Sequence, residues 1–214
     1  QRGSLQLVIR QMKQDGLGNL FLEFEKRKQD LLKAGYFAED HKKSKPEYIE
    51  NIGVITGANA AALQDVLSTI QRRWPMMKVT LYPSLVQGNL APKSLIQSLK
   101  KADLCGHDAL LIVRGGGSFE DLFCFNDVEL VKTIYDLNTY IVSGVGHEVD
   151  TTLCDLVCDH RSVTPTAAAQ WVSIDQNEVM AKIIKDKVLL SRNMSIILDQ
   201  YRSKLNLYQN HPYL

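Results

Sequence analysis

The chain lacks long hydrophobic runs, and none of its apolar stretches reaches the roughly 18 residues that a membrane-spanning helix needs. Its first residues also lack the apolar region of a secretory signal peptide. Hydrophobic residues make up 45% and charged residues 23% of the 214 residues, proportions typical of a folded globular protein. We therefore expect a soluble, cytoplasmic protein that does not contact a membrane.

An excess of charge of one sign is also absent, because 25 Lys and Arg stand against 24 Asp and Glu, a net charge of +1. No overall field then draws a polyanion to the protein, so any affinity for nucleic acid must be local. Cysteine is scarce, and the four cysteines lack the C-x-x-C spacing of common metal and redox sites. We expect Cys105, Cys124, Cys154 and Cys158 to be buried and reduced.

Changes in composition divide the chain into four parts. Residues 1–14 alternate partly between apolar and polar side chains, and we expect them to be the last strand of a preceding domain. Residues 15–50 comprise a helix predicted over 19–34, with Gly35 as its C-cap, and a basic linker around His41–Pro46. The main domain covers residues 51–173. Residues 174–214 form the fourth part.

Strands alternate with helices within residues 51–173, which is the pattern of a parallel sheet covered on both faces. The predicted strands are 52–56, 78–82, 109–113 and 140–145, and the predicted helices are 60–74, 92–102, 127–137 and 152–159. Thr164 and Pro165 indicate the start of a further helix. We expect an α/β fold with an open parallel sheet. Ligands bind such sheets outside the carboxyl ends of the strands.

The strand 109–113 runs directly into Arg114 and the loop Gly115, Gly116, Gly117 and Ser118. Glycines at this place let backbone N–H groups approach an anion closely, and Arg114 can add a bidentate contact to the same phosphate. The loop matches neither the P-loop nor the G-x-G-x-x-G fingerprint. A tight strand-to-helix turn without a ligand is the alternative interpretation.

The strand 140–145 also ends in glycine, Gly146, and is followed by His147 and Asp150. Histidine can transfer a proton near neutral pH or attack phosphorus itself, and a carboxylate three residues along a helical turn can orient its ring. We therefore predict that His147 and Asp150 are catalytic, on the same edge of the sheet as Arg114. An isolated His-x-x-Asp would instead indicate a helix cap or a surface pair.

The first strand ends at Thr56 and leads through small residues into the helix 60–74. The N-terminal N–H groups of a helix in this position attract phosphate. Asp65, the one acid of that helix, is either a further catalytic residue or a side chain that faces solvent.

The loop after Ser118 combines three phenylalanines with two acids. Phe119, Phe123 and Phe125 either stack on bases, as in sequence-neutral single-strand binders, or pack beneath the loop. Glu120 and Asp121 either ligate a hard cation or cap the following helix.

Residues 174–214 show no β pattern and are predicted to form one long helix. Apolar residues recur mostly every three or four positions, at Met180, Ile183, Ile184, Leu190, Met194, Ile197, Tyr201, Leu205 and Tyr208. This stripe is too regular for a solvated helix and too isolated to form a core alone. We expect it to pair with another helix or another subunit.

Four motifs, at residues 52–65, 114–126, 145–150 and 164–169, resemble in order and spacing the large subunit of exodeoxyribonuclease VII. The resemblance covers about residues 45–172. It implies that residues 1–14 are the final strand of an OB-fold domain that binds single strands. It also implies that the α/β domain is catalytic and that the C-terminal helical region recruits several copies of a small subunit.

The resemblance further implies an enzyme that hydrolyses single-stranded DNA to short oligonucleotides. Its active site would be formed by Asp65, Arg114, His147 and Asp150. The loop Gly115–Ser118, with Thr56 and Gly146, would contact the phosphate. The family implies no required cofactor, and whether Mg²⁺ takes part stays open.

Two mechanisms are compatible with these residues: hydrolysis by water with general acid–base help, or attack by His147 through a covalent phosphohistidine. Asp65 would either hold Arg114 or activate water. Two other functions stay open. The chain can be a non-catalytic module that binds a phosphate or nucleotide at Gly115–Gly117, or an assembly subunit built on the long helix.

Overall fold

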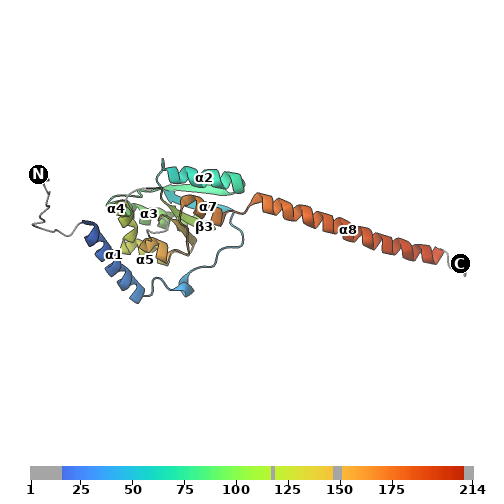
Figure 1. The fold of residues 1–214 in the computed structure, drawn as a ribbon, viewed down its shortest axis with the longest axis horizontal. Coiled ribbons are helices and arrows are strands. Elements are labelled where there is room, and N and C mark those ends of the chain that lie inside the picture. Colours follow the sequence, from blue (N-terminus) through green and yellow to red (C-terminus); the bar gives the residue numbers. More distant parts are fainter. Residues whose placement is uncertain (1–15, 117–118, 147–150, 210–214) are drawn as a thin grey trace, which may run out of the picture. The chain divides into compact units, whose positions relative to one another are not determined.

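A computed structural model describes residues 16–116, 119–146 and 151–209 of the chain (Figure 1). The described residues form two compact units, one ending at Ser173 and the other beginning at Ile174. None of the described helices is both long enough and apolar enough to cross a membrane. The strand predicted within residues 1–14 lies outside the described residues.

The first unit is built on a five-stranded sheet in which all neighbouring strands are parallel, in the order β2-β1-β3-β4-β5. The strands are β1 (Asn51–Thr56), β2 (Lys78–Pro83), β3 (Ala109–Val113), β4 (Tyr140–Gly144) and β5 (His160–Arg161). Every residue of β3 is apolar and buried, as expected for a central parallel strand. The predicted α/β fold with an open parallel sheet is confirmed.

The sequence does not predict β5, because its two residues, His160 and Arg161, are too few and too polar to show a strand pattern. Its pairing depends on tertiary structure: His160 lies opposite Val142 of β4, and Arg161 lies opposite Ser143. The four predicted strands agree with β1 to β4 to within one residue at each end.

Helices cover both faces of this sheet (Figure 1). On one face α2 (Ala61–Arg73) packs against α7 (Pro165–Val172), and on the other α3 (Ala91–Asp103) packs against α5 (Val128–Asp136), with α6 (Leu153–Val157) beside α5. Each face has its own cluster of buried apolar side chains, so the sheet lies between two halves of the core. The short α4 (Phe119–Leu122) and the 3-10 helix η2 (Phe123–Asn126) connect β3 to α5.

Local caps fix where these helices begin and end. The hydroxyl of Thr164 accepts a hydrogen bond from the backbone N–H of Ala167, which confirms the predicted start of α7. α1 (Gly16–Lys33) buries Leu31 in the core cluster on the α3 and α5 face. It is followed by Gly35 with a φ of 84°, which confirms the predicted C-cap.

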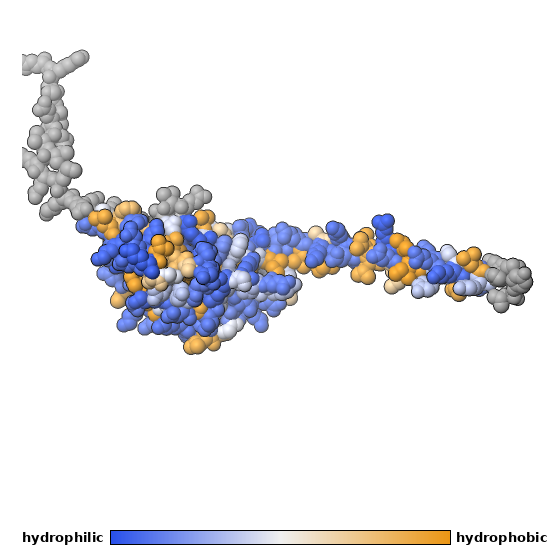
Figure 2. All heavy atoms as spheres, turned by 90° about the horizontal axis from the view of Figure 1, so that it is seen from below, coloured by the Kyte–Doolittle hydropathy of each residue, from blue (hydrophilic) through white to orange (hydrophobic). Residues whose placement is uncertain are grey.

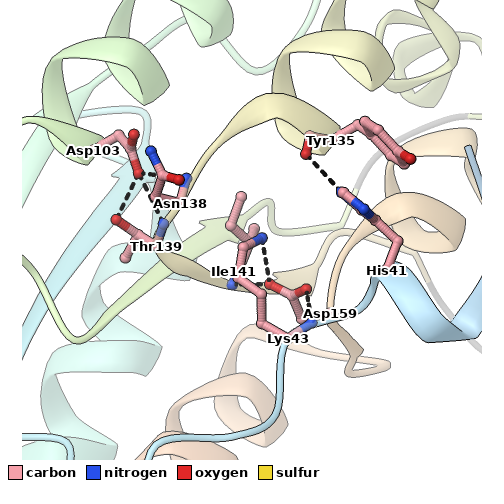
Figure 3. Close-up of polar contacts among 8 residues, drawn as sticks. All are labelled: His41, Lys43, Asp103, Tyr135, Asn138, Thr139, Ile141 and Asp159. Carbon is pink, nitrogen blue, oxygen red and sulfur yellow. Dashed lines mark hydrogen bonds and ion pairs between the residues drawn. The ribbon is translucent and has the colours of Figure 1, made fainter.

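The segment predicted as a basic linker is held against the domain, and we call residues 41–45 the strap. The His41 ring stacks on Tyr135 with 3.6 Å between centroids (Figure 3). The backbone N–H of Lys43 donates to Asp159 Oδ1 at 2.8 Å, and Asp159 Oδ2 accepts from the backbone N–H of Ile141 at 2.7 Å. Because Ile141 lies at the start of β4, the strap is fixed at the amino edge of the sheet.

The cysteines differ in exposure, and all four are free. Cys154 and Cys158 are buried and Cys124 is partly buried, whereas Cys105 is exposed. The expectation of a buried thiol is therefore wrong for Cys105. This residue follows the last turn of α3 and precedes Gly106, whose positive φ of 68° turns the chain at the surface.

The second unit contains a single long helix, α8 (Gln176–Gln209), in agreement with the prediction of one long helix in this region. None of its residues is buried, although many are large and apolar. Figure 2 shows orange apolar groups at several places along this helix, among blue polar ones. Exposed Leu189, Ile196 and Leu207 lie outside the predicted stripe, so apolar side chains occupy more than one side of α8.

Candidate active site

The ends of β1, β3 and β4 lie at the same level on the carboxyl edge of the sheet. Ile55 pairs with Ile112, Val113 pairs with Gly144, and the backbone N–H of Arg114 donates to the carbonyl of Gly144 at 3.2 Å. The structure therefore brings Thr56, Arg114 and the start of the segment after Gly144 together at one edge, as the parallel topology predicts.

Arg114 is the buried cation of this edge, with 5% of its surface exposed. Its Nη2 donates to Asp121 Oδ2 at 3.2 Å, and the side chain of Asp121 is 37% exposed. A guanidinium has five N–H donors, so this ion pair leaves donors for a second anion. The sequence predicts Asp121 to be a helix cap or a cation ligand. The structure shows it as the partner of Arg114.

Thr56 occupies the end of β1, where its side chain is fully buried. Its hydroxyl has no hydrogen-bond partner within the described part of the chain. A buried hydroxyl without a partner costs free energy, on the order of 1 to 3 kcal/mol, unless a ligand or water satisfies it. Thr56 is therefore a group that a bound anion or water would stabilise.

Gly115, the first residue of the glycine loop, lies against the start of α2. A Cβ on Gly115 would stand 3.8 Å from the backbone nitrogen of Ala62, in the first turn of the helix. That turn contains no acidic residue, and Ala60, its N-cap, provides no side-chain hydrogen bond. The N–H groups at the start of α2 thus face the loop that the sequence predicts to bind phosphate.

Asp65 lies one turn further along α2 and is exposed. Among the interactions that the structure describes, Arg114 pairs with Asp121 and not with Asp65. Asp65 follows Ala62 by three residues, so the two lie on neighbouring positions of one helix side. Ala62 is the residue of α2 that adjoins Gly115.

Four of the predicted site residues, Gly117, Ser118, His147 and Asp150, lie outside the described residues. The chain on both sides of them is described: Gly116 is exposed and Gly146 is buried at the carboxyl edge of the sheet.

The phenylalanines of the following loop differ in their positions. Phe125 is fully buried in the core cluster, so it packs beneath the loop and is not available to stack on a base. Phe123 is partly buried, and the guanidinium of Arg27 lies 5.2 Å from its ring centroid. The side chains of Phe123 and Arg27 line a hollow of about 300 Å³ beside Gly88 and Asp127.

Cys124 adjoins Arg114 but does not act as a thiolate at neutral pH. Burial raises its pKa to about 11, although the positive charge of Arg114 opposes the shift. Three or more His, Cys, Asp or Glu side chains do not gather anywhere in residues 16–116, 119–146 and 151–209 in a way that fits a metal ion.

Comparison with known proteins shows the family to which the chain belongs. The profile of the family described as "Exonuclease VII, large subunit" matches residues 36–212. The chain belongs to this family. The Exonuclease VII large-subunit profile thus extends over the strap, the whole sheet and all of α8.

Several proteins named exodeoxyribonuclease 7 large subunit are similar to the chain. The protein from Oceanobacillus iheyensis is 43% identical over 204 residues, which is 95% of this chain and 45% of that protein. Those from Staphylococcus haemolyticus and Clostridium botulinum are 40% and 39% identical over 96% and 97% of this chain, and 46% and 52% of their own lengths. The chain spans about half the length of the curated relatives it matches.

Proposed function

We propose that the chain is the catalytic part of an exonuclease that hydrolyses phosphodiester bonds of single-stranded DNA to short oligonucleotides, as the large subunit of exonuclease VII. The observation that carries this proposal is the buried Arg114 guanidinium at the carboxyl edge of the sheet, in a chain of this family. A cation at this place offsets the charge that a phosphate gains in the transition state.

The scissile phosphate would lie between Arg114, the loop Gly115–Ser118 and the start of α2. Arg114 contacts Asp121 of α4, and the next residue, Gly115, adjoins Ala62 of α2, so α4 and α2 both reach this edge of the sheet. Thr56 would donate its unpaired hydroxyl. These donors bind an anion without a requirement for base sequence, which suits a nuclease that degrades any single strand.

His147 would transfer the proton or attack phosphorus, and Asp150 would orient its ring. Because Arg114 already has Asp121 as its carboxylate, Asp65 is the better candidate for activating water than for holding Arg114. A phosphohistidine trapped during turnover would distinguish attack by His147 from attack by water.

The apolar side chains of α8 support a partner of helical structure. The helix exposes Ile183 and Ile197 of the predicted stripe as well as Leu189 and Ile196 on other sides, a pattern that suits contact with more than one helix. We infer that copies of the exonuclease VII small subunit bind here, in the cytoplasm.

The test is cleavage of end-labelled single-stranded and duplex DNA by the protein with its small subunit, in EDTA and in Mg²⁺. His147→Ala should reduce single-strand cutting at least about 100-fold, because a proton-transfer group is lost. His41→Ala, at the amino edge of the sheet, is the matched control and should cut normally. Survival of cutting in EDTA would favour acid–base or covalent histidine chemistry over metal catalysis.

Two results would contradict the proposal. Equal cutting by the His147→Ala variant would remove its catalytic role. Binding of phosphate or nucleotide without any cutting, with the small subunit present, would instead favour a non-catalytic binding module.

A further inference from the structure

Asp155 is a buried carboxylate that contacts both sides of the segment carrying His147 and Asp150. Its Oδ1 accepts a hydrogen bond from the Ser143 hydroxyl at 2.7 Å, on β4 before the segment. Its Oδ2 accepts from the backbone N–H of Thr152 at 2.9 Å and from the Thr152 hydroxyl at 2.8 Å, just after the segment. One side chain thus joins the end of β4 to the start of α6.

All three residues of this cluster are removed from solvent: Ser143 is fully buried, and Thr152 and Asp155 are each 2% exposed. The cluster lies among fully buried Leu153 and Cys154. Burying polar groups costs free energy unless they are hydrogen-bonded, and these three side chains satisfy one another. The cluster is therefore a directional link between β4 and α6.

Asn126 links the start of α6 to η2 and α1. Its Oδ1 accepts from the backbone N–H of Leu153, the first residue of α6, at 2.8 Å. Its backbone carbonyl accepts from Arg27 of α1 at 2.7 Å. Asn126 ends η2, so the start of α6 is tied to the segment that connects β3 to α5.

We propose that Asp155 is a positioning residue, which holds the end of β4 and the start of α6 at a fixed separation and so fixes both ends of the chain between them. The proposal rests on the proposed nuclease function for its effect on catalysis, though not for its effect on structure. A misplacement of about 1 Å costs on the order of 100-fold in rate when reacting groups must align.

The chain offers a matched control at the opposite end of β4. Asp103 also accepts three hydrogen bonds, from the backbone N–H groups of Asn138 and Thr139 and from the Thr139 hydroxyl, at 3.1, 2.9 and 2.7 Å (Figure 3). Asp103→Asn removes the same kind of contact from the amino edge of the sheet, away from Arg114. It therefore separates loss of stability from loss of position.

The experiment compares Asp155→Asn with Asp103→Asn in the protein with its small subunit. Hydrogen–deuterium exchange of backbone amides 145–151 reports position, and kcat and KM on single-stranded DNA report its consequence. Asp155→Asn should raise exchange of these amides and lower kcat on the order of 100-fold, with KM changed by less than about twofold. Asp103→Asn should lower the free energy of unfolding and leave exchange at 145–151 and kcat unchanged.

A second pair of variants guards against misfolding of Asp155→Asn. Thr152→Ser keeps the hydroxyl and should retain normal exchange and kcat, whereas Thr152→Val has the same shape without it and should behave like Asp155→Asn. Equal exchange in Asp155→Asn and Asp103→Asn, or equal losses in the two Thr152 variants, would overturn the proposal. If the unmutated protein cuts no DNA, the nuclease function fails, and exchange still decides whether Asp155 positions the segment.

Discussion

Arg114 differs in burial from the other cations that the structure describes. Among the described lysines and arginines it alone has less than a tenth of its surface exposed. Its planar fork can hold Asp121 with one N–H and present others to a phosphate, which the compact ammonium of a lysine cannot do with the same geometry. Its role therefore depends on shape as well as on charge.

Arg114→Lys should accordingly impair the proposed cleavage of DNA although it keeps the charge. Loss of one donor to the phosphate in the transition state costs on the order of 100-fold in kcat/KM. The measurement is steady-state cleavage of single-stranded DNA. Arg73→Lys, in the last turn of α2, is the control for loss of a guanidinium, and equal rates in both variants would show that Arg114 contributes only its charge.

His107 makes the stability of the domain depend on pH. Its Nδ1 and Nε2 lie 3.0 Å from Asn51 Oδ1 and 2.7 Å from the Tyr82 hydroxyl, so the neutral ring donates to one and accepts from the other. Burial lowers the pKa of His107, and the nearby Asp108 partly opposes the shift. In the unfolded chain the pKa of this histidine is about 6.5, so His107 binds a proton more readily there than in the folded chain.

The free energy of unfolding should therefore be fully retained above about pH 6.5 and fall as the pH drops toward the lowered pKa of the folded state. Urea unfolding at pH 7.5 and 5.5 measures this fall. In His107→Gln the stability at pH 7.5 should be lower, but its fall with pH should be smaller. If the free energy of unfolding of His107→Gln falls with pH as much as that of the unmutated protein, the pH dependence comes from other groups.

At the scale of elements, the ends of strands and helices are more constrained than their middles. Gly144 ends β4 beneath α7, and a Cβ there would stand 3.0 Å from the Thr164 carbonyl oxygen and 3.1 Å from the Ala168 Cβ. Contacts this close require the start of α7 to move. The absence of a side chain at Gly144 thus sets the distance between β4 and α7.

Gly144→Ala should destabilise the first unit by about 1 to 3 kcal/mol, as overpacking of a core does. Urea unfolding followed by circular dichroism is the measurement. Gly57→Ala is the matched control, because a Cβ there would meet the Ala60 Cβ at an ordinary 3.5 Å. A Gly144 variant as stable as the Gly57 variant would show that α7 shifts without cost.

The elements that sequence predicts well are those with a long local pattern. β1 to β4, the flanking helices and α8 each repeat apolar residues over enough positions to indicate their type. β5 has two polar residues and exists only because β4 is beside it. The ion pair between Arg114 and Asp121 depends in the same way on how α4 lies at the end of β3, which no local pattern specifies.

The sequence contained one signal for the Asp155 cluster. Thr152 and Asp155 are spaced as a capping box, and the structure shows both of its reciprocal hydrogen bonds. What the spacing does not reveal is the third contact, to Ser143, because that residue is nine positions before Thr152. The sequence therefore predicts where α6 starts, but not the hydrogen bond from Ser143 that links it to β4.

At the scale of the whole molecule, the first unit uses the two edges of its parallel sheet differently. The strap, Asp103 and Asp159 bind the amino edge, whereas Arg114, Thr56 and the glycine loop lie at the carboxyl edge. α8, in the second unit, contributes no buried residue. If the proposed function holds, fold, chemistry and assembly depend on different residues, and each can be altered separately.

Ile183→Asp combined with Ile197→Asp should abolish binding of the small subunit while the first unit keeps its thermal stability. Charges on a buried helical interface are costly, on the order of several kcal/mol for two desolvated carboxylates. Isothermal titration with the small subunit measures binding. Ser195→Asp places the same charge two residues from Ile197 and off the predicted stripe; loss of binding in this control would show sensitivity to charge alone.

α8 has a further consequence for how assembly can be observed. At 34 residues it is about 50 Å long, and none of its side chains is buried to stabilise it. Isolated helices gain most of their stability from packing, so the helix content of α8 should rise and fall with occupancy by its partner. If the proposed small subunit binds α8, the far-ultraviolet circular dichroism of the free chain, titrated with that subunit, measures the fraction of the chain that has bound it.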